Sequence, residues 1–114
     1  VLYNLMRRGI EWELLPWMMK RKIPAMAYSP IEQGRLSRHV KLRDFAKRHD
    51  MSATQAALAW LLHRDQVMVI PKTGNPERMR ENAKAAEISL NKAALAELDA
   101  LFPPPKGPVP LEML

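Results

Sequence analysis

Three polar side chains that lie close together in the sequence could bind a phosphate group: Lys72, Thr73 and Arg78. Two cations and a hydroxyl group complement the charge and the oxygen atoms of a phosphate. A β-branched run at 67–70 predicts a short buried strand that ends just before Lys72. The types and spacing of these residues therefore indicate an anion site at the end of a strand.

The elements around these residues must supply the rest of such a site. Pro71 cannot donate to a central ladder and so ends the strand. Asn75 is a favoured N-cap, and Pro76 suits the first position of a helix over 76–86. The free amides and the positive end of the helix dipole would then face the same loop. Junctions of this kind with a lysine are also common where no ligand binds, so a purely structural role stays open.

A second group of residues lies at the end of another predicted strand, 23–28. Tyr28 and Ser29 end this strand, and Gly34 follows in the predicted loop 31–40. Ligand sites of parallel α/β folds gather at the carboxyl ends of the strands, where a tyrosine ring can stack on a flat heterocycle. A glycine lets the backbone approach a ligand closely. Alternatively, Tyr28 covers the end of the sheet and Ser29 starts a Ser-Pro turn.

The whole pattern alternates strands with helices, which predicts an α/β fold with parallel strands. Strands are predicted at 1–5, 23–28 and 67–70, and helices at 14–21, 41–48, 53–63 and 76–86, with a last helix after Asn91. Three parallel strands cannot cover both faces of their own sheet, and they leave two open edges. We therefore expect the chain, which starts with Val1 inside a strand, to be part of a larger α/β protein.

Local patterns also predict the caps and the buried faces of the helices. Ser52 and Gln55 form a capping-box pattern, and Asn91 is a favoured N-cap. Apolar faces are predicted for three helices and consist of Leu42, Phe45 and Ala46, of Ala57, Leu58, Leu61 and Leu62, and of Leu95, Leu98, Leu101 and Phe102. We expect the methionines to fill the core. Three tryptophans are expected to pack helices against the sheet: Trp12, Trp17 and Trp60.

The composition limits the class of protein. The 114 residues include no cysteine, which excludes disulfides and thiolate metal sites and fits a cytoplasmic protein. No apolar run approaches the roughly 18 residues that a membrane-spanning helix needs. The net charge of +6 comes from scattered basic residues, which favours a solvated surface over a nucleic-acid site. His39, His49 and His63 lack the spacing of metal ligands and are expected at the surface or at helix ends.

Two motifs together resemble the cofactor site of the aldo-keto reductases: AYSPIEQGRL at 27–36 and IPKTGNPERMREN at 70–82. The segment MSATQAALAWLL between them resembles the intervening helix of that family, and GIEWELLPW and LDALFPPPKGPVPLEML resemble its bacterial members. The resemblance implies a (β/α)8 TIM barrel, with this chain as its C-terminal part, about strands six to eight with their helices. Residues 1–114 would then form part of an NADP-dependent oxidoreductase domain, with 103–114 as an extended proline-rich tail.

The same resemblance implies that the end of the first of these strands holds the reactive half of NADPH. Tyr28 matches the residue that stacks on the nicotinamide ring. The stretch that follows the pyrophosphate is matched by Ser29, Ile31, Gln33 and Gly34.

The second motif would hold the adenosine half of the cofactor. Lys72, Thr73 and Arg78 match residues that bind the 2′-phosphate of NADPH. Asn75 lies in the same loop, and Glu81 and Asn82 match groups that bind the adenine. Two cations beside a phosphate favour NADPH over NADH.

The resemblance implies NADPH-dependent reduction of small aldehydes and ketones to alcohols, without nucleic-acid or membrane partners. The catalytic Asp, Tyr, Lys and His of the family lie on earlier strands and are absent here. This chain would therefore supply the NADPH-binding half and be inactive without the N-terminal half of the barrel. Two alternatives stay open: a non-enzymatic cofactor-binding or interaction module, and a basic helical nucleic-acid binder. The latter would use 41–48 and 53–63 as a helix-turn-helix, although the apolar centre of 53–63 argues for burial.

Overall fold

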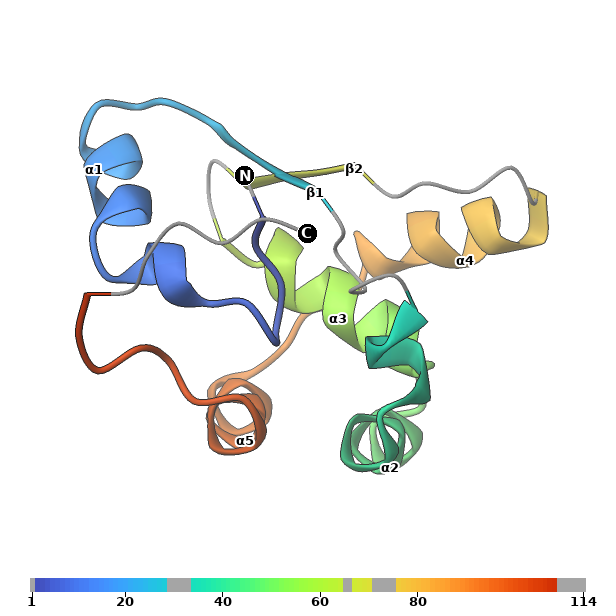
Figure 1. Cartoon of the computed structure of the whole chain (residues 1–114). Helices are drawn as coiled ribbons and strands as arrows, with labels where there is room; N and C mark the ends of the chain where they lie inside the picture. The colour runs from blue at the N-terminus through green and yellow to red at the C-terminus, as the bar shows by residue number, and fades with distance from the viewer. Residues whose placement is uncertain (1, 29–33, 65–66, 71–75, 109–114) are drawn as a thin grey trace.

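The computed structural model describes residues 2–28, 34–64, 67–70 and 76–108, and its strands alternate with helices along the chain (Figure 1). In chain order the elements are the 3-10 helix η1 (Gly9–Glu11), α1 (Leu14–Lys20), β1 (Ala25–Tyr28), the 3-10 helix η3 (Leu36–Arg38), α2 (Val40–Arg48), α3 (Ala53–Leu62), β2 (Val67–Ile70), α4 (Pro76–Ala85) and α5 (Lys92–Leu101). This order confirms the predicted α/β class.

The two described strands form a parallel pair, as the alternation of elements predicts. Ala25 lies opposite Val67, and Tyr28 lies opposite Ile70. The crossover between the strands runs through α2 and α3, and Figure 1 shows α3 directly below the sheet. Ala25, Ala27 and Val67 are buried in the same core as α3. One face of the sheet is therefore covered by helices.

The other face of this sheet carries exposed methionines. Met26 and Met68 are register partners, and their side chains are 49% and 52% exposed. Successive side chains of a strand point to opposite faces, so these two point away from the helices that bury Ala25 and Val67. The prediction that the strand at 67–70 is buried therefore holds for Val67 and is wrong for Met68. The expectation that methionines fill the core also fails for the other exposed ones, Met6, Met19 and Met79.

The strand predicted at 1–5 is absent from its described residues, 2–5, which belong to neither named strand. Asn4 instead closes a tight turn. Its backbone N–H donates to the Arg7 carbonyl at 3.3 Å, and the Arg7 N–H donates to the Asn4 carbonyl at 3.0 Å. The Asn4 side-chain oxygen also accepts from the N–H groups of Met6 and Arg7, at 2.8 and 3.0 Å. These bonds use backbone groups that a longer ladder would need.

Helix α3 forms the centre of the core, and its capping box is confirmed. Ser52 and Gln55 exchange side-chain-to-backbone hydrogen bonds at its N-terminus. All residues from Ala56 to Leu61 are buried, so this helix has no polar face to present to DNA bases. The expectation that Leu62 points inward is wrong, because this last residue of the helix is 37% exposed.

The other helices follow their predicted patterns closely. Asn91 caps α5 by accepting a hydrogen bond from the Ala94 N–H at 2.8 Å. The predicted apolar face of α2 is buried throughout, and in α5 Leu98 is fully buried while Leu95 packs at the edge of the core. Helix α4 begins at Pro76, as predicted, and Asn75 lies outside the described residues.

The histidines and tryptophans divide between helix ends, core and surface. All three histidines lie at helix ends, as predicted: His39 is the N-cap of α2, and His49 and His63 are C-caps of α2 and α3. Trp60 is 1% exposed and packs in the core. Trp12 and Trp17 are 44% and 48% exposed, so the prediction that they pack against the sheet is wrong.

The end of the described chain contains no regular element. Residues 103–108 form neither helix nor strand, and the remainder of the predicted tail lies outside the described residues. Within the described ranges, no helix combines the length and the apolar character that crossing a membrane requires.

Candidate cofactor site

The parallel pairing of β1 and β2 brings their carboxyl ends to one edge of the sheet. Tyr28 lies directly opposite Ile70 at this edge, so the chain leaves both strands side by side. Helix α4 starts six residues after Ile70, and Arg78 is its third residue. The backbone thus places the start of both predicted motif loops at the same end of the sheet, where parallel α/β folds bind ligands.

Much of the predicted site falls outside what the structure describes. Six of its residues lie in undescribed segments: Ser29, Ile31, Gln33, Lys72, Thr73 and Asn75. Tyr28 and Arg78 are placed through their backbones alone. The roles assigned to these eight residues stay predictions.

Gly34 is described, and its backbone explains why a glycine stands there. Its φ of +91° lies in the left-handed region, which residues with a Cβ atom rarely adopt. The Ser37 hydroxyl donates to the Gly34 carbonyl at 2.7 Å and holds the turn that leads into η3. The glycine is therefore required by the turn, whether or not a ligand approaches it.

Glu81 is the predicted site residue with the best-defined surroundings. It is half-buried on α4, one position before the equally half-buried Asn82. The Ser52 hydroxyl donates to Glu81 Oε1 at 2.5 Å, and Gln55 Nε2 donates to the Glu81 carbonyl at 3.3 Å. The capping box of α3 thus docks directly onto the part of α4 that is predicted to bind adenine.

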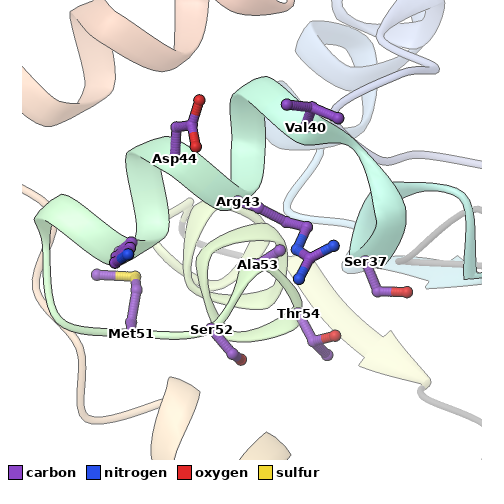
Figure 2. Close-up of a pocket in the computed structure, with 9 residues that line it drawn as sticks. Ser37, Val40, Arg43, Asp44, Met51, Ser52, Ala53 and Thr54 are labelled. Atoms are coloured by element: carbon purple, nitrogen blue, oxygen red, sulfur yellow. The ribbon is translucent and has the colours of Figure 1, made fainter.

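A groove opens beside this contact, between α2 and the start of α3 (Figure 2). Its volume of about 530 Å³ is within the range of small-molecule sites. In Figure 2 the Arg43 side chain extends toward Ser37 and Thr54. The groove is lined by Ser37, Val40, Arg43, Asp44, Lys47, Met51, Ser52, Ala53 and Thr54.

The sequence predicted neither this groove nor a contact between Ser52 and the candidate site. The capping-box pattern was a sufficient signal for the role of Ser52 in α3. Its contact with Glu81, 29 positions later, has no local signal. The groove likewise combines residues from η3, α2 and α3, and only the packing of these elements brings them together.

A buried ionic cluster lies elsewhere in the fold, around Arg8. The Arg8 guanidinium donates to Glu11 at 2.6 and 2.9 Å, to Asp99 at 2.7 Å and to the Phe102 carbonyl at 2.6 Å. Arg8 is only 6% exposed, so it is an exception to the solvated surface role expected for most of the basic residues. Burial alone would lower the pKa of Arg8, but the hydrogen bonds and charges of Glu11 and Asp99 raise it.

This cluster is distinct from the candidate cofactor site. Arg8 lies 4.9 Å from the ring centroid of Trp60, which is eight residues beyond Ser52, or about 12 Å along α3. Tyr3 belongs to the same cluster and donates to Glu11 at 2.8 Å. Burial, followed by the charge of Glu11, raises the pKa of the Tyr3 hydroxyl. A fully buried phenol with this partner is not placed to act as a catalytic acid.

Metal chemistry finds no support in the described part of the chain. No group of three or more histidine or acidic side chains that could hold an ion is present among those residues.

Comparison with known proteins connects this geometry to one family. The sequence model of the Aldo/keto reductase family matches residues 1–102. Methylglyoxal reductase YeaE of Escherichia coli is 42% identical over 119 aligned residues, which cover all of this chain and 42% of that protein. Glyoxal reductase of Bacillus subtilis is 33% identical over 108 aligned residues, covering 94% of this chain and 39% of the relative.

A solved structure shows the same relationship in three dimensions. The aldo-keto reductase from Klebsiella pneumoniae, determined in complex with NADPH, is 38% identical and superposes with a TM-score of 0.94. The superposition covers all of this chain and 42% of the Klebsiella chain. The chain thus spans about two fifths of the length of these relatives. With a family match over residues 1–102 and a shared fold along its length, this chain belongs to the aldo/keto reductase family.

Proposed function

We propose that this chain supplies the NADPH-binding part of a cytoplasmic aldo-keto reductase that reduces aldehydes and ketones to alcohols. It would form the C-terminal part of the barrel, about strands six to eight with their helices. The observation that carries this proposal is the sheet edge at which Tyr28 lies opposite Ile70. From that edge the two motif loops depart together, one with the residues assigned to the nicotinamide and the other with those assigned to the 2′-phosphate.

The described residues fit the adenosine end of such a cofactor. Glu81 offers a carboxylate that can accept from the exocyclic amine of adenine, and Asn82 offers both donors and acceptors for the ring nitrogens. Both are half-buried, and Glu81 is bonded to Ser52 on the wall of the groove of about 530 Å³. Known relatives support the assignment, since the Klebsiella structure is a complex with NADPH.

The 2′-phosphate would be held by Lys72, Thr73 and Arg78, with Asn75 in the same loop. Tyr28 would stack on the nicotinamide, which supplies a hydride when the cofactor is bound. Ser29, Ile31, Gln33 and Gly34 would line the pyrophosphate. These residues bind and orient; the proton for the product alcohol must come from a group outside this chain.

The rest of the barrel is needed for this reaction. Met26 and Met68 point to the same face of the sheet and are about half exposed, whereas a parallel sheet is normally covered on both faces. We propose that the remaining strands of the barrel cover this face and bring the catalytic Asp, Tyr, Lys and His. The names of the relatives, reductases of methylglyoxal and glyoxal, favour a small carbonyl substrate.

The test compares the Kd for NADPH with the Kd for NADH, measured in the complete reductase polypeptide that contains this chain. Replacing Lys72 and Arg78 with alanine removes two charged donors from a dianion, so the Kd for NADPH should rise by about 100-fold or more. The Kd for NADH should change little. A double replacement of Arg80 and Lys84, which are exposed on the same helix, removes the same charge and serves as the control. Unchanged affinity for both dinucleotides would refute the proposal.

A further inference from the structure

We propose that Ser52 is a positioning residue that holds the Glu81 carboxylate for recognition of the adenine amino group. This inference rests on the proposed function, because it concerns the selectivity of the same cofactor site. It assigns to the N-cap of α3 a second role beyond stabilising that helix.

The hydroxyl proton of Ser52 is committed to Glu81. A serine hydroxyl has one proton to donate and can accept two hydrogen bonds. Ser52 Oγ accepts from the Gln55 N–H at 3.1 Å, which is the capping interaction. Its proton is donated to Glu81 Oε1 at 2.5 Å. One side chain therefore caps α3 and orients the carboxylate on α4 at the same time.

Gln55 holds the backbone of the same residue. Its Oε1 accepts from the Ser52 N–H at 3.0 Å, and its Nε2 donates to the Glu81 carbonyl at 3.3 Å. Glu81 is thus attached to the capping box through both its side chain and its main chain. Because α3 is buried from Ala56 to Leu61, its N-terminus is held in place by the core and supports this attachment.

The consequence for a ligand follows from the geometry of a carboxylate. With Oε1 engaged, the orientation of Oε2 is fixed as well, and this oxygen can accept from an amine on the ligand. Without Ser52 the glutamate side chain regains its free rotation and must lose it again when the ligand binds. Ser52 also lines the groove of about 530 Å³, so the residue that orients the carboxylate is itself accessible from this groove. Through this contact, the capping box of α3 would contribute to the selectivity of the site for adenine.

The distinguishing probe is the hypoxanthine analogue of NADPH, in which a carbonyl oxygen replaces the amino group of adenine. Glu81 accepts from the amino group but repels the carbonyl oxygen. The selectivity ratio is the Kd for the analogue divided by the Kd for NADPH. Because N1 also gains a proton in hypoxanthine, the change in this ratio caused by each variant, rather than the ratio itself, measures the contact. In the complete reductase polypeptide we expect Glu81→Ala to lower the ratio by about tenfold. Ser52→Ala should lower it by about threefold, and Ser52→Thr, which keeps the hydroxyl, should leave it unchanged.

A matched control separates positioning from the loss of a helix cap. Asn91→Ala removes the N-cap of α5, whose side chain bonds to the Ala94 N–H, and should leave the ratio unchanged although the protein becomes less stable. In an Ser52→Ala/Glu81→Ala double variant, the ratio should equal that of Glu81→Ala alone, because Ser52 acts through Glu81.

The outcomes distinguish the two proposals. If the unmodified protein does not bind NADPH, the proposed function fails and this inference fails with it. If NADPH binds and Glu81→Ala lowers the ratio while Ser52→Ala does not, the positioning role is overturned and the proposed function stands. A ratio unaffected by Glu81→Ala would overturn the role of both residues in base recognition and leave NADPH binding intact.

Discussion

Replacing Arg8 with methionine tests whether the buried ionic cluster stabilises the fold. Arg8 is 6% exposed and links the segment before η1 to α5 through Glu11, Asp99 and the Phe102 carbonyl. Methionine keeps most of the length and apolar contact of the side chain but has no donors. The change therefore removes the hydrogen bonds without opening a large cavity.

The expected loss of unfolding free energy depends on the groups that lose Arg8 as their hydrogen-bond donor. Glu11 is 10% exposed and loses its bonds to Arg8 at 2.6 and 2.9 Å, although the Tyr3 hydroxyl at 2.8 Å and Arg64 at 3.2 Å remain. Breaking a buried ion pair costs about 3–5 kcal/mol, and an orphaned buried carbonyl, here that of Phe102, costs about 1–3 kcal/mol. Asp99 is 50% exposed and can be hydrated instead. Because Arg64 retains part of the charge balance and methionine buries apolar area, we expect a net loss of about 3 kcal/mol.

Urea denaturation of the complete polypeptide, followed by circular dichroism, would measure this loss as a lower midpoint at an unchanged slope. Arg48→Met is the control, since Arg48 is 60% exposed and pairs with Glu97 at the surface; its midpoint should hardly move. A loss below about 1 kcal/mol for Arg8→Met would refute the reasoning, because it would mean that Glu11 and the Phe102 carbonyl are solvated in the folded protein.

Three further predictions concern the stability and the self-association of the fold. Because burial and Glu11 raise the pKa of Tyr3 above its ordinary value of 10.0, the folded state keeps a proton that the unfolded state loses. The contribution of Tyr3 to the unfolding free energy should therefore be fully retained below pH 10 and should fall above it by about 1.4 kcal/mol per pH unit. Urea titrations at pH 9 to 11 would measure this slope, and Tyr3→Phe should reduce it. Asn91→Ala should lower the unfolding free energy by about 1 kcal/mol in the same assay, and a neutral result would contradict the capping role of Asn91. The chain produced without the rest of the barrel should self-associate through its exposed sheet face. Replacing both Met26 and Met68 with lysine should reduce this association in gel filtration, whereas a sharp monomeric peak for the unmodified chain would contradict it.

The features that could be predicted from the sequence depend on residues only a few positions apart. The capping box of Ser52 and Gln55, the cap at Asn91 and the positions of the strands around Ala25 and Val67 all follow from local hydrogen bonding and periodicity. The family could be recognised because the two motifs are continuous segments of chain. Parallel pairing also follows from local information, since alternating strands and helices leave little other choice.

Burial and long-range contacts were decided only by the tertiary structure. Arg8 has the same charge as the exposed Arg48, but it is buried where Asp99 and the Phe102 carbonyl, 91 and 94 positions later, accept hydrogen bonds from its guanidinium. Met68 belongs to an apolar run, yet it is exposed because the helices cover only the opposite face of the sheet. Ser52 is a helix cap in the sequence and touches Glu81 only because α3 and α4 pack together. A residue's type states what it can bond to; which groups come within its reach depends on segments that lie far away along the chain.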